Sequence, residues 1–133
     1  MSNKVKIFTN GCFDILHRGH VELLNFCKSQ GSELIVGLNS DKSVKNLKGL
    51  KRPINSEEDR KFMLLNLKSV DQVIIFDEDT PYNLIKEIKP DIIVKGGDYS
   101  KEEVVGSNLA KVIIFNYNNG YSTTKIIQDI IDR

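Results

Sequence analysis

The residues best suited to chemistry are two histidines three positions apart, His17 and His20, with Gly19 between them. An apolar run at positions 5–8 precedes them and predicts a strand, and the run at 21–28 predicts a helix. The turn from a strand into a helix is where an open α/β sheet binds its ligand. A helix start also offers free N–H groups and a positive dipole end to an anion. The segment therefore predicts a pocket that binds phosphate groups.

Two other interpretations of these histidines stay open. A zinc site is one, although structural zinc takes four protein ligands and catalytic zinc takes three. The chain supplies two histidines and two cysteines, and Cys27 falls on the inner face of the predicted helix. Ordinary polar residues in a turn are the other interpretation. Asp14 and the glycines that flank this segment suit specific turn positions, which favours a loop built for a purpose.

Composition limits the classes of protein to which the chain can belong. It has 133 residues, 40% of them hydrophobic and 28% charged, which is typical of one globular domain spanning 1–133. The formal net charge of +1 gives no field that would attract nucleic acid. No apolar run approaches the roughly 20 residues that a membrane helix needs, and the N-terminus does not resemble a signal peptide. With two cysteines and no disulfide pattern, we expect a cytoplasmic protein without nucleic-acid or membrane partners.

Strand-like and helix-like segments alternate along the rest of the chain. Further strands are predicted at 33–39, 72–76, 91–95 and 111–115. Helices are predicted from Ser56 to about Lys68, from Pro81 to Pro90 and after Ser122, with a short helical piece at 101–105. The last helix is expected to point its isoleucines inward, namely Ile126, Ile127, Ile130 and Ile131. The pattern predicts a single Rossmann-like α/β domain with a doubly wound, mostly parallel five-stranded sheet and helices on both faces.

The segments that leave the carboxyl ends of the predicted strands carry further candidates. Gly96 and Gly97 would let the backbone approach a flat base or a ribose, and Asp98 would accept from a hydroxyl or amino group. A simple turn is the alternative for these three residues. The other segment is a helix start whose hydroxyl and N–H groups would hold phosphate while they cap the helix: Ser122, Thr123 and Thr124.

A basic stretch between Ser40 and Asn55 is either a solvated surface or an arm that closes over a triphosphate. Lys45 and Lys48 would share one face if this stretch is helical. Each would then act as a point charge on phosphate oxygens. Arg60, in the helix that follows, would reach the same anion or form an ion pair within its own helix.

Two motifs resemble those of a known family. The run GCFDILHRGH at 11–20 looks like the GxFDxLHxGH signature of the cytidylyltransferase-like nucleotidyltransferases, and STTKI at 122–126 resembles their second signature. Within the family, five segments look like the heptose 1-phosphate adenylyltransferase domain of bacterial ADP-heptose synthesis: TNG at 9–11, NSD at 39–41, LKG at 47–49 with RP at 52–53, EDTP at 78–81 and VKGGDY at 94–99. Glycerol-3-phosphate cytidylyltransferases are similar at both signatures but usually carry RTxGxSTT where this chain reads YNNGYSTT. That departure counts against the cytidylyl interpretation.

The resemblance implies a reaction in which a nucleoside monophosphate passes to a sugar phosphate and pyrophosphate is released, with no covalent enzyme intermediate. ATP with D-glycero-D-manno-heptose 1-phosphate is the expected pair of substrates. CTP with glycerol 3-phosphate or another polyol phosphate is the alternative, and a nucleotide-binding module without turnover is a third. The resemblance also implies Mg²⁺ bridging the phosphates, and a homodimer is possible because relatives are commonly dimers.

The resemblance further implies roles for individual residues. His17, His20 and Lys48 would be catalytic, and Lys45 and Arg60 would bind a substrate phosphate. Asp14 would anchor the loop. The nucleotide would be contacted by Asn10, Gly11, Cys12, Phe13, Gly19, Gly96, Gly97, Asp98, Ser122, Thr123 and Thr124.

Overall fold

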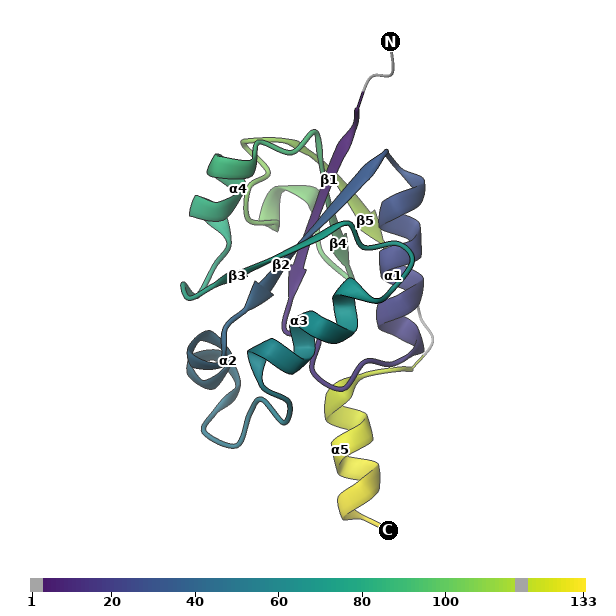
Figure 1. Ribbon diagram of the computed structural model, residues 1–133, viewed down its shortest axis with the longest axis vertical. Coiled ribbons are helices and arrows are strands. Elements are labelled where there is room, and N and C mark those ends of the chain that lie inside the picture. Colours follow the sequence, from purple (N-terminus) through teal and green to yellow (C-terminus); the bar gives the residue numbers. More distant parts are fainter. Residues whose placement is uncertain (1–3, 117–119) are drawn as a thin grey trace.

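Five parallel strands form one sheet in the computed structural model, which describes residues 4–116 and 120–133. The strands are β1 (Lys6–Gly11), β2 (Glu33–Asn39), β3 (Gln72–Phe76), β4 (Ile92–Gly96) and β5 (Lys111–Phe115). Their order across the sheet is β3-β2-β1-β4-β5, and all four pairings are parallel (Figure 1). This arrangement confirms the predicted Rossmann-like α/β class.

Helices follow the strands as the alternating pattern predicts. They are α1 (Arg18–Ser29), α2 (Asp41–Lys48), α3 (Glu57–Leu65), α4 (Tyr82–Ile88), the 3-10 turn η1 (Lys101–Glu103) and α5 (Thr123–Ile131). Ser40, Ser56 and Ser122 each cap a helix, since their hydroxyl oxygens accept from the N–H three residues later. The basic stretch that begins at position 40 therefore starts as a helix. In the described parts of the chain, no helix has the length and apolar character to cross a membrane.

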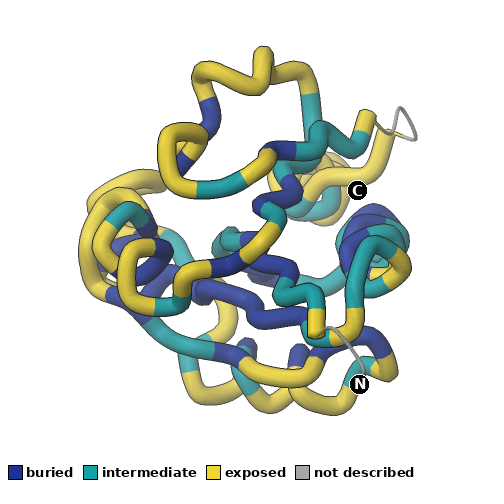
Figure 2. Tube along the Cα trace, turned by 90° about the horizontal axis from the view of Figure 1, so that it is seen from above, coloured by how far each residue is buried: buried dark blue, intermediate teal, exposed yellow. Residues whose placement is uncertain are grey.

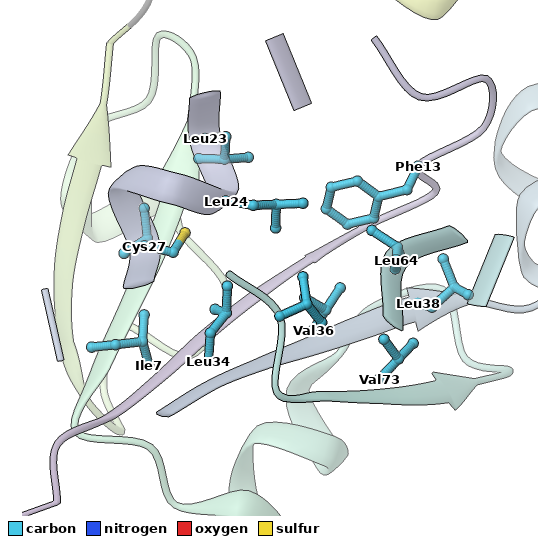
Figure 3. Close-up of a cluster of buried hydrophobic side chains, with 12 residues drawn as sticks. Ile7, Phe13, Leu23, Leu24, Cys27, Leu34, Val36, Leu38, Leu64 and Val73 are labelled. Carbon is cyan, nitrogen blue, oxygen red and sulfur yellow. The ribbon is translucent and has the colours of Figure 1, made fainter. Parts of the chain in front are cut away.

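Each face of the sheet has its own hydrophobic core. On one face, α1 and α3 pack Leu23, Leu24, Cys27 and Leu64 against side chains of the central strands (Figure 3). On the other face, α4 and the segment after η1 contribute Leu84, Ile85 and Val104. The strands between these layers are the most buried part of the molecule (Figure 2). Helices on both faces were predicted, and the strands can be continuously apolar because both of their faces are covered.

The prediction for the last helix is wrong in one respect. No residue of α5 is buried, and Ile130 and Ile131 are 59% and 69% exposed. The helix projects away from the body of the molecule, at the end opposite the N-terminus (Figure 1). The isoleucine spacing indicates that the helix has an apolar face, but it does not say whether the rest of the chain lies against that face.

Candidate active site

A cavity of about 480 Å³ lies where the chain order of the sheet reverses. β1 has β2 on one side and β4 on the other: the chain adds β2 and β3 outward on one side, then crosses to add β4 and β5 on the other. Asn10 and Gly11 of β1, Asn39 of β2 and Lys95 of β4 all line the cavity, and all four lie at the carboxyl ends of their strands. This is the position at which doubly wound sheets bind ligands.

The two histidines line the cavity in one connected arrangement. His17 caps α1, because its Nδ1 accepts from the N–H of Gly19 at 3.1 Å. The Nδ1 of His20 accepts from the N–H of His17 at 3.2 Å, and the two rings stack with centroids 3.7 Å apart. With both Nδ1 atoms acting as acceptors, the neutral rings carry their hydrogens on Nε2. The backbone therefore fixes two adjacent Nε2–H donors at the start of a helix.

Both imidazoles are neutral at pH 7 in the free protein. Burial lowers the pKa of His20 to about 4, assisted by the neighbouring His17 and opposed by Asp14. Burial also lowers the pKa of His17. An anion bound at the two Nε2 atoms would reverse this tendency, because it favours the protonated form of each ring. The site is thus built to receive negative charge.

The low pKa of His20 makes the free protein sensitive to acid. The unfolded chain, with a histidine pKa near 6.5, takes up a proton that the folded chain accepts only near pH 4, so stability falls as the pH falls between these values. We expect His20 to lower the free energy of unfolding by about 2 kcal/mol between pH 7 and pH 5. Urea titrations at both pH values, on the wild type and on His20→Asn, measure this difference. Equal pH dependence in the two proteins would contradict it.

Asp14 joins three loops at the edge of the cavity. Its carboxylate accepts from the N–H groups of Ile54 and Asn55 at 2.6 and 2.9 Å. Its backbone carbonyl accepts from the Thr123 hydroxyl at 2.5 Å. The side chain is fully buried, with the Arg52 Nε 3.5 Å from it. Asp14 therefore has the anchoring role expected from the sequence, and it links the two signature segments directly.

Arg60 is buried behind the cavity and does not line it, contrary to the role expected from the sequence. Its side chain is 1% exposed, and its guanidinium donates to the backbone carbonyls of Cys12, Asn39 and Asn55. It also forms an ion pair with Asp41 at 2.8 Å. These bonds hold the ends of β1 and β2 to the start of α3, so Arg60 supports the site from behind. The expectation that it binds a substrate phosphate does not fit this burial.

Arg52 is the arginine that lines the cavity; the sequence analysis used it only as part of the family resemblance and gave it no role in the site. Its Nε is buried but makes no hydrogen bond within the residues that the structure describes. The neighbouring Asp14 carboxylate is already used by two N–H groups. The sequence signal was the basic stretch, but nothing in the charge pattern distinguished Arg52 from the lysines around it.

Most of the other predicted site residues lie together. Those that line the main cavity besides the histidines are Asn10, Gly11, Cys12, Phe13, Lys48, Ser122, Thr123 and Thr124. Gly96 lines a smaller neighbouring cavity, and Gly19 is buried in the first turn of α1. Lys45, Gly97 and Asp98 line neither of these two cavities. Residues to which the sequence analysis gave no site role also line the main one: Lys95, Asp79, Thr80, Pro81, Val105 and Tyr121.

The carboxylates around the cavity do not form a metal cage. No group of three or more histidine, cysteine or acidic side chains that could hold a metal ion occurs within residues 4–116 and 120–133. Of the two aspartates that line the cavity, Asp14 is occupied by hydrogen bonds, whereas Asp79 is exposed. A metal ion at this site would take its other ligands from substrate and water.

Comparison with known proteins decides the family. The family model described as cytidylyltransferase-like matches residues 8–129. The chain belongs to the cytidylyltransferase-like family. It is a nucleotidyltransferase, and the cavity at its two signature segments is the candidate active site.

Curated proteins and a solved structure resemble this chain in sequence. The bifunctional protein HldE of a Nitratiruptor species is 58% identical over 92% of this chain, and that of Helicobacter pylori is 57% identical over 93%. In both cases the match covers 27% of the relative, so the chain spans about a quarter of their length. A solved structure, the lipopolysaccharide core biosynthesis protein from Thermoplasma volcanium, is 30% identical with a TM-score of 0.73. That likeness covers 90% of this chain and 100% of the other.

Proposed function

We propose that this chain transfers the adenylyl group of ATP to D-glycero-D-manno-heptose 1-phosphate, forming ADP-heptose and pyrophosphate. The observation that carries the proposal is the pair of stacked histidines, whose Nδ1 atoms are used by the backbone and whose Nε2–H groups remain as donors. A pair of fixed neutral donors at a helix start suits phosphate oxygens.

The reaction needs no nucleophile from the protein. An oxygen of the sugar 1-phosphate attacks the α-phosphorus of ATP and forms a new P–O bond. The bond from that phosphorus to the oxygen bridging to the β-phosphate breaks, and pyrophosphate leaves with the electron pair. The protein contributes by positioning the two substrates and stabilising charge.

Side chains and backbone N–H groups of the cavity would stabilise the charge that develops on the transferred phosphoryl group and on pyrophosphate. His17 and His20 donate from Nε2, and Lys48, which lines the same cavity, supplies a positive charge. The N–H groups at the start of α5 bind phosphate oxygens beside the Ser122 cap. Mg²⁺, when bound, would neutralise phosphate charge. The single exposed aspartate of the cavity, Asp79, fits the preference of Mg²⁺ for substrate phosphates, water and few carboxylates.

The choice of ATP and a heptose phosphate rests on similarity. The curated relatives at 55–58% identity are named bifunctional protein HldE. The sequence run before α5 also lacks the arginine that glycerol-3-phosphate cytidylyltransferases usually carry. Transfer from CTP to glycerol 3-phosphate is the competing activity, because the first signature is common to both groups.

Release of pyrophosphate tests the proposal. The protein is incubated with ATP or CTP and with heptose 1-phosphate or glycerol 3-phosphate, and pyrophosphate is followed in a coupled assay. We expect release with ATP and heptose 1-phosphate only. Release with CTP and glycerol 3-phosphate would move the chain to the competing activity. Tight binding of ATP without release for either acceptor would make the chain a nucleotide-binding module.

A further inference from the structure

Lys95 lines three cavities of the molecule. It lies one residue before the end of β4, where it pairs with Ile114 of β5. It lines the main cavity, a second cavity of about 120 Å³ shared with His20, and a third of about 150 Å³ beside Tyr99. Asn10 is the other residue that lines all three. These two residues, near the carboxyl ends of β1 and β4, are therefore common to all three cavities.

Within residues 4–116 and 120–133, the amine of Lys95 has no anionic partner. It makes no hydrogen bond or ion pair with any residue that the structure describes, and its Nζ lies over the Tyr99 ring, 5.4 Å from the centroid. The residue is only partly exposed. Burial, with Lys48 as a further cause, lowers its pKa, while Cys12 opposes the shift. A half-buried amine without a counter-ion is costly to the free protein unless a ligand supplies the negative charge.

His20 and Lys95 approach the same space from different elements. His20 is on α1 and Lys95 on β4, and both line the main cavity and the 120 Å³ cavity. A phosphoryl group that accepts from His20 Nε2 would therefore lie within reach of the lysine. We infer that Lys95 binds the phosphoryl group that the histidines bind and neutralises the charge that builds on it during transfer. The claim that Lys95 neutralises charge during transfer rests on the proposed function. The claim that it binds the phosphoryl group requires only that a nucleotide binds.

The positive charge of Lys95 should also set the upper pH limit of the reaction. The titratable and charged groups that line these three cavities with it are Cys12, Asp14, His17, His20, Lys48, Arg52, Asp79, Tyr99, Glu103 and Tyr121. Glu103 is occupied by Ser100, which donates to it from both its hydroxyl and its N–H. As the pH rises, loss of the proton from Lys95 would remove the charge that holds the phosphoryl group. Arginine at this position would keep its charge and move the limit upward.

The experiment compares Lys95→Met and Lys95→Arg with Lys111→Met. Methionine keeps much of the stem of the lysine but removes its charge. Lys111 is a matched control, because it is exposed at the opposite end of the neighbouring strand β5. For each protein, ATP affinity is measured by calorimetry, and kcat and KM by pyrophosphate release across pH. Circular dichroism checks the fold.

We expect Lys95→Met to weaken ATP binding about tenfold and to lower kcat about 100-fold, with Lys111→Met unchanged. Lys95→Arg should restore part of kcat and shift the alkaline limb of the pH profile upward. A folded Lys95→Met protein with wild-type affinity and turnover would overturn the inference, as would an alkaline limb that stays in place in Lys95→Arg. If the wild type binds ATP but releases no pyrophosphate, the proposed function fails, and the affinity of Lys95→Met still decides whether the lysine binds phosphate. A wild type that binds no nucleoside triphosphate would overturn both.

Discussion

Replacing His20 with asparagine is expected to lower kcat about 100- to 1,000-fold while the protein remains folded. The asparagine side chain places an oxygen near the position of Nδ1, so it can still accept from the N–H of His17 and keep the first turn of α1 in place. It has no group near Nε2, so the donor to the phosphoryl oxygen is lost. The loss corresponds to about 2.7–4 kcal/mol of transition-state stabilisation, as for the removal of one oxyanion-hole donor.

His20→Gln is the matched control for this prediction. Glutamine reaches further and places an amide N–H near the Nε2 position, so it should retain more turnover than asparagine. Steady-state kinetics of pyrophosphate release on both variants, with circular dichroism and urea unfolding, separate the donor from the cap. Wild-type turnover in folded His20→Asn would remove the histidine from the mechanism.

Replacing Arg60 with methionine is expected to reduce the free energy of unfolding by about 3–5 kcal/mol. The substitution leaves the Asp41 carboxylate without its ion-pair partner and three backbone carbonyls without their donor. The carboxylate and the three carbonyls belong to three separate segments, around residues 12, 39–41 and 55. Losing Arg60 therefore weakens the contacts between these segments behind the cavity. A loss of this size is a large part of the stability of an ordinary domain.

Urea unfolding of Arg60→Met against Arg18→Met measures this loss. Arg18 forms an exposed ion pair with Glu22 within α1, with 72% of its side chain exposed, and its replacement should leave stability close to that of the wild type. If Arg60 instead acted only on substrate, its variant would unfold like the wild type and would differ in KM alone. That result would contradict the structural role.

The strands were predictable because each is an apolar run bounded by polar turns. The strand at 33–39 begins and ends at the predicted residues, and so do those at 72–76 and 111–115. β1 extends beyond its apolar run to Gly11, because Thr9, Asn10 and Gly11 pair with residues 36–38 of β2. Polar residues at the end of a strand carry no apolar signal, so this extension became visible only with its partner strand. It is also what carries Asn10 and Gly11 into the cavity.

The site was predictable where its residues are close in sequence and not where burial decides the role. The histidine motif is local, since its hydrogen bonds span two and three residues. The roles of Arg52 and Arg60 depend on which of them is buried behind β1 and β2, and both occur in similarly polar sequence. Lys95 is the last residue of the strand predicted at 91–95, and a lysine at a strand end carries no local sign that it lines a cavity. Long-range packing, which no local pattern encodes, separates these cases.

The hydrogen bond between Thr123 and the carbonyl of Asp14 closes a loop of 109 residues. During synthesis, β1, α1 and β2 can associate early because their contacts are close in sequence, but this bond must wait for almost the entire chain. Closure of such a long loop also carries an entropic cost that the later contacts must offset. A nascent chain can therefore have most of its sheet and still lack a completed pocket. The part of the cavity that Thr123 lines can therefore be completed only after α5 has been made.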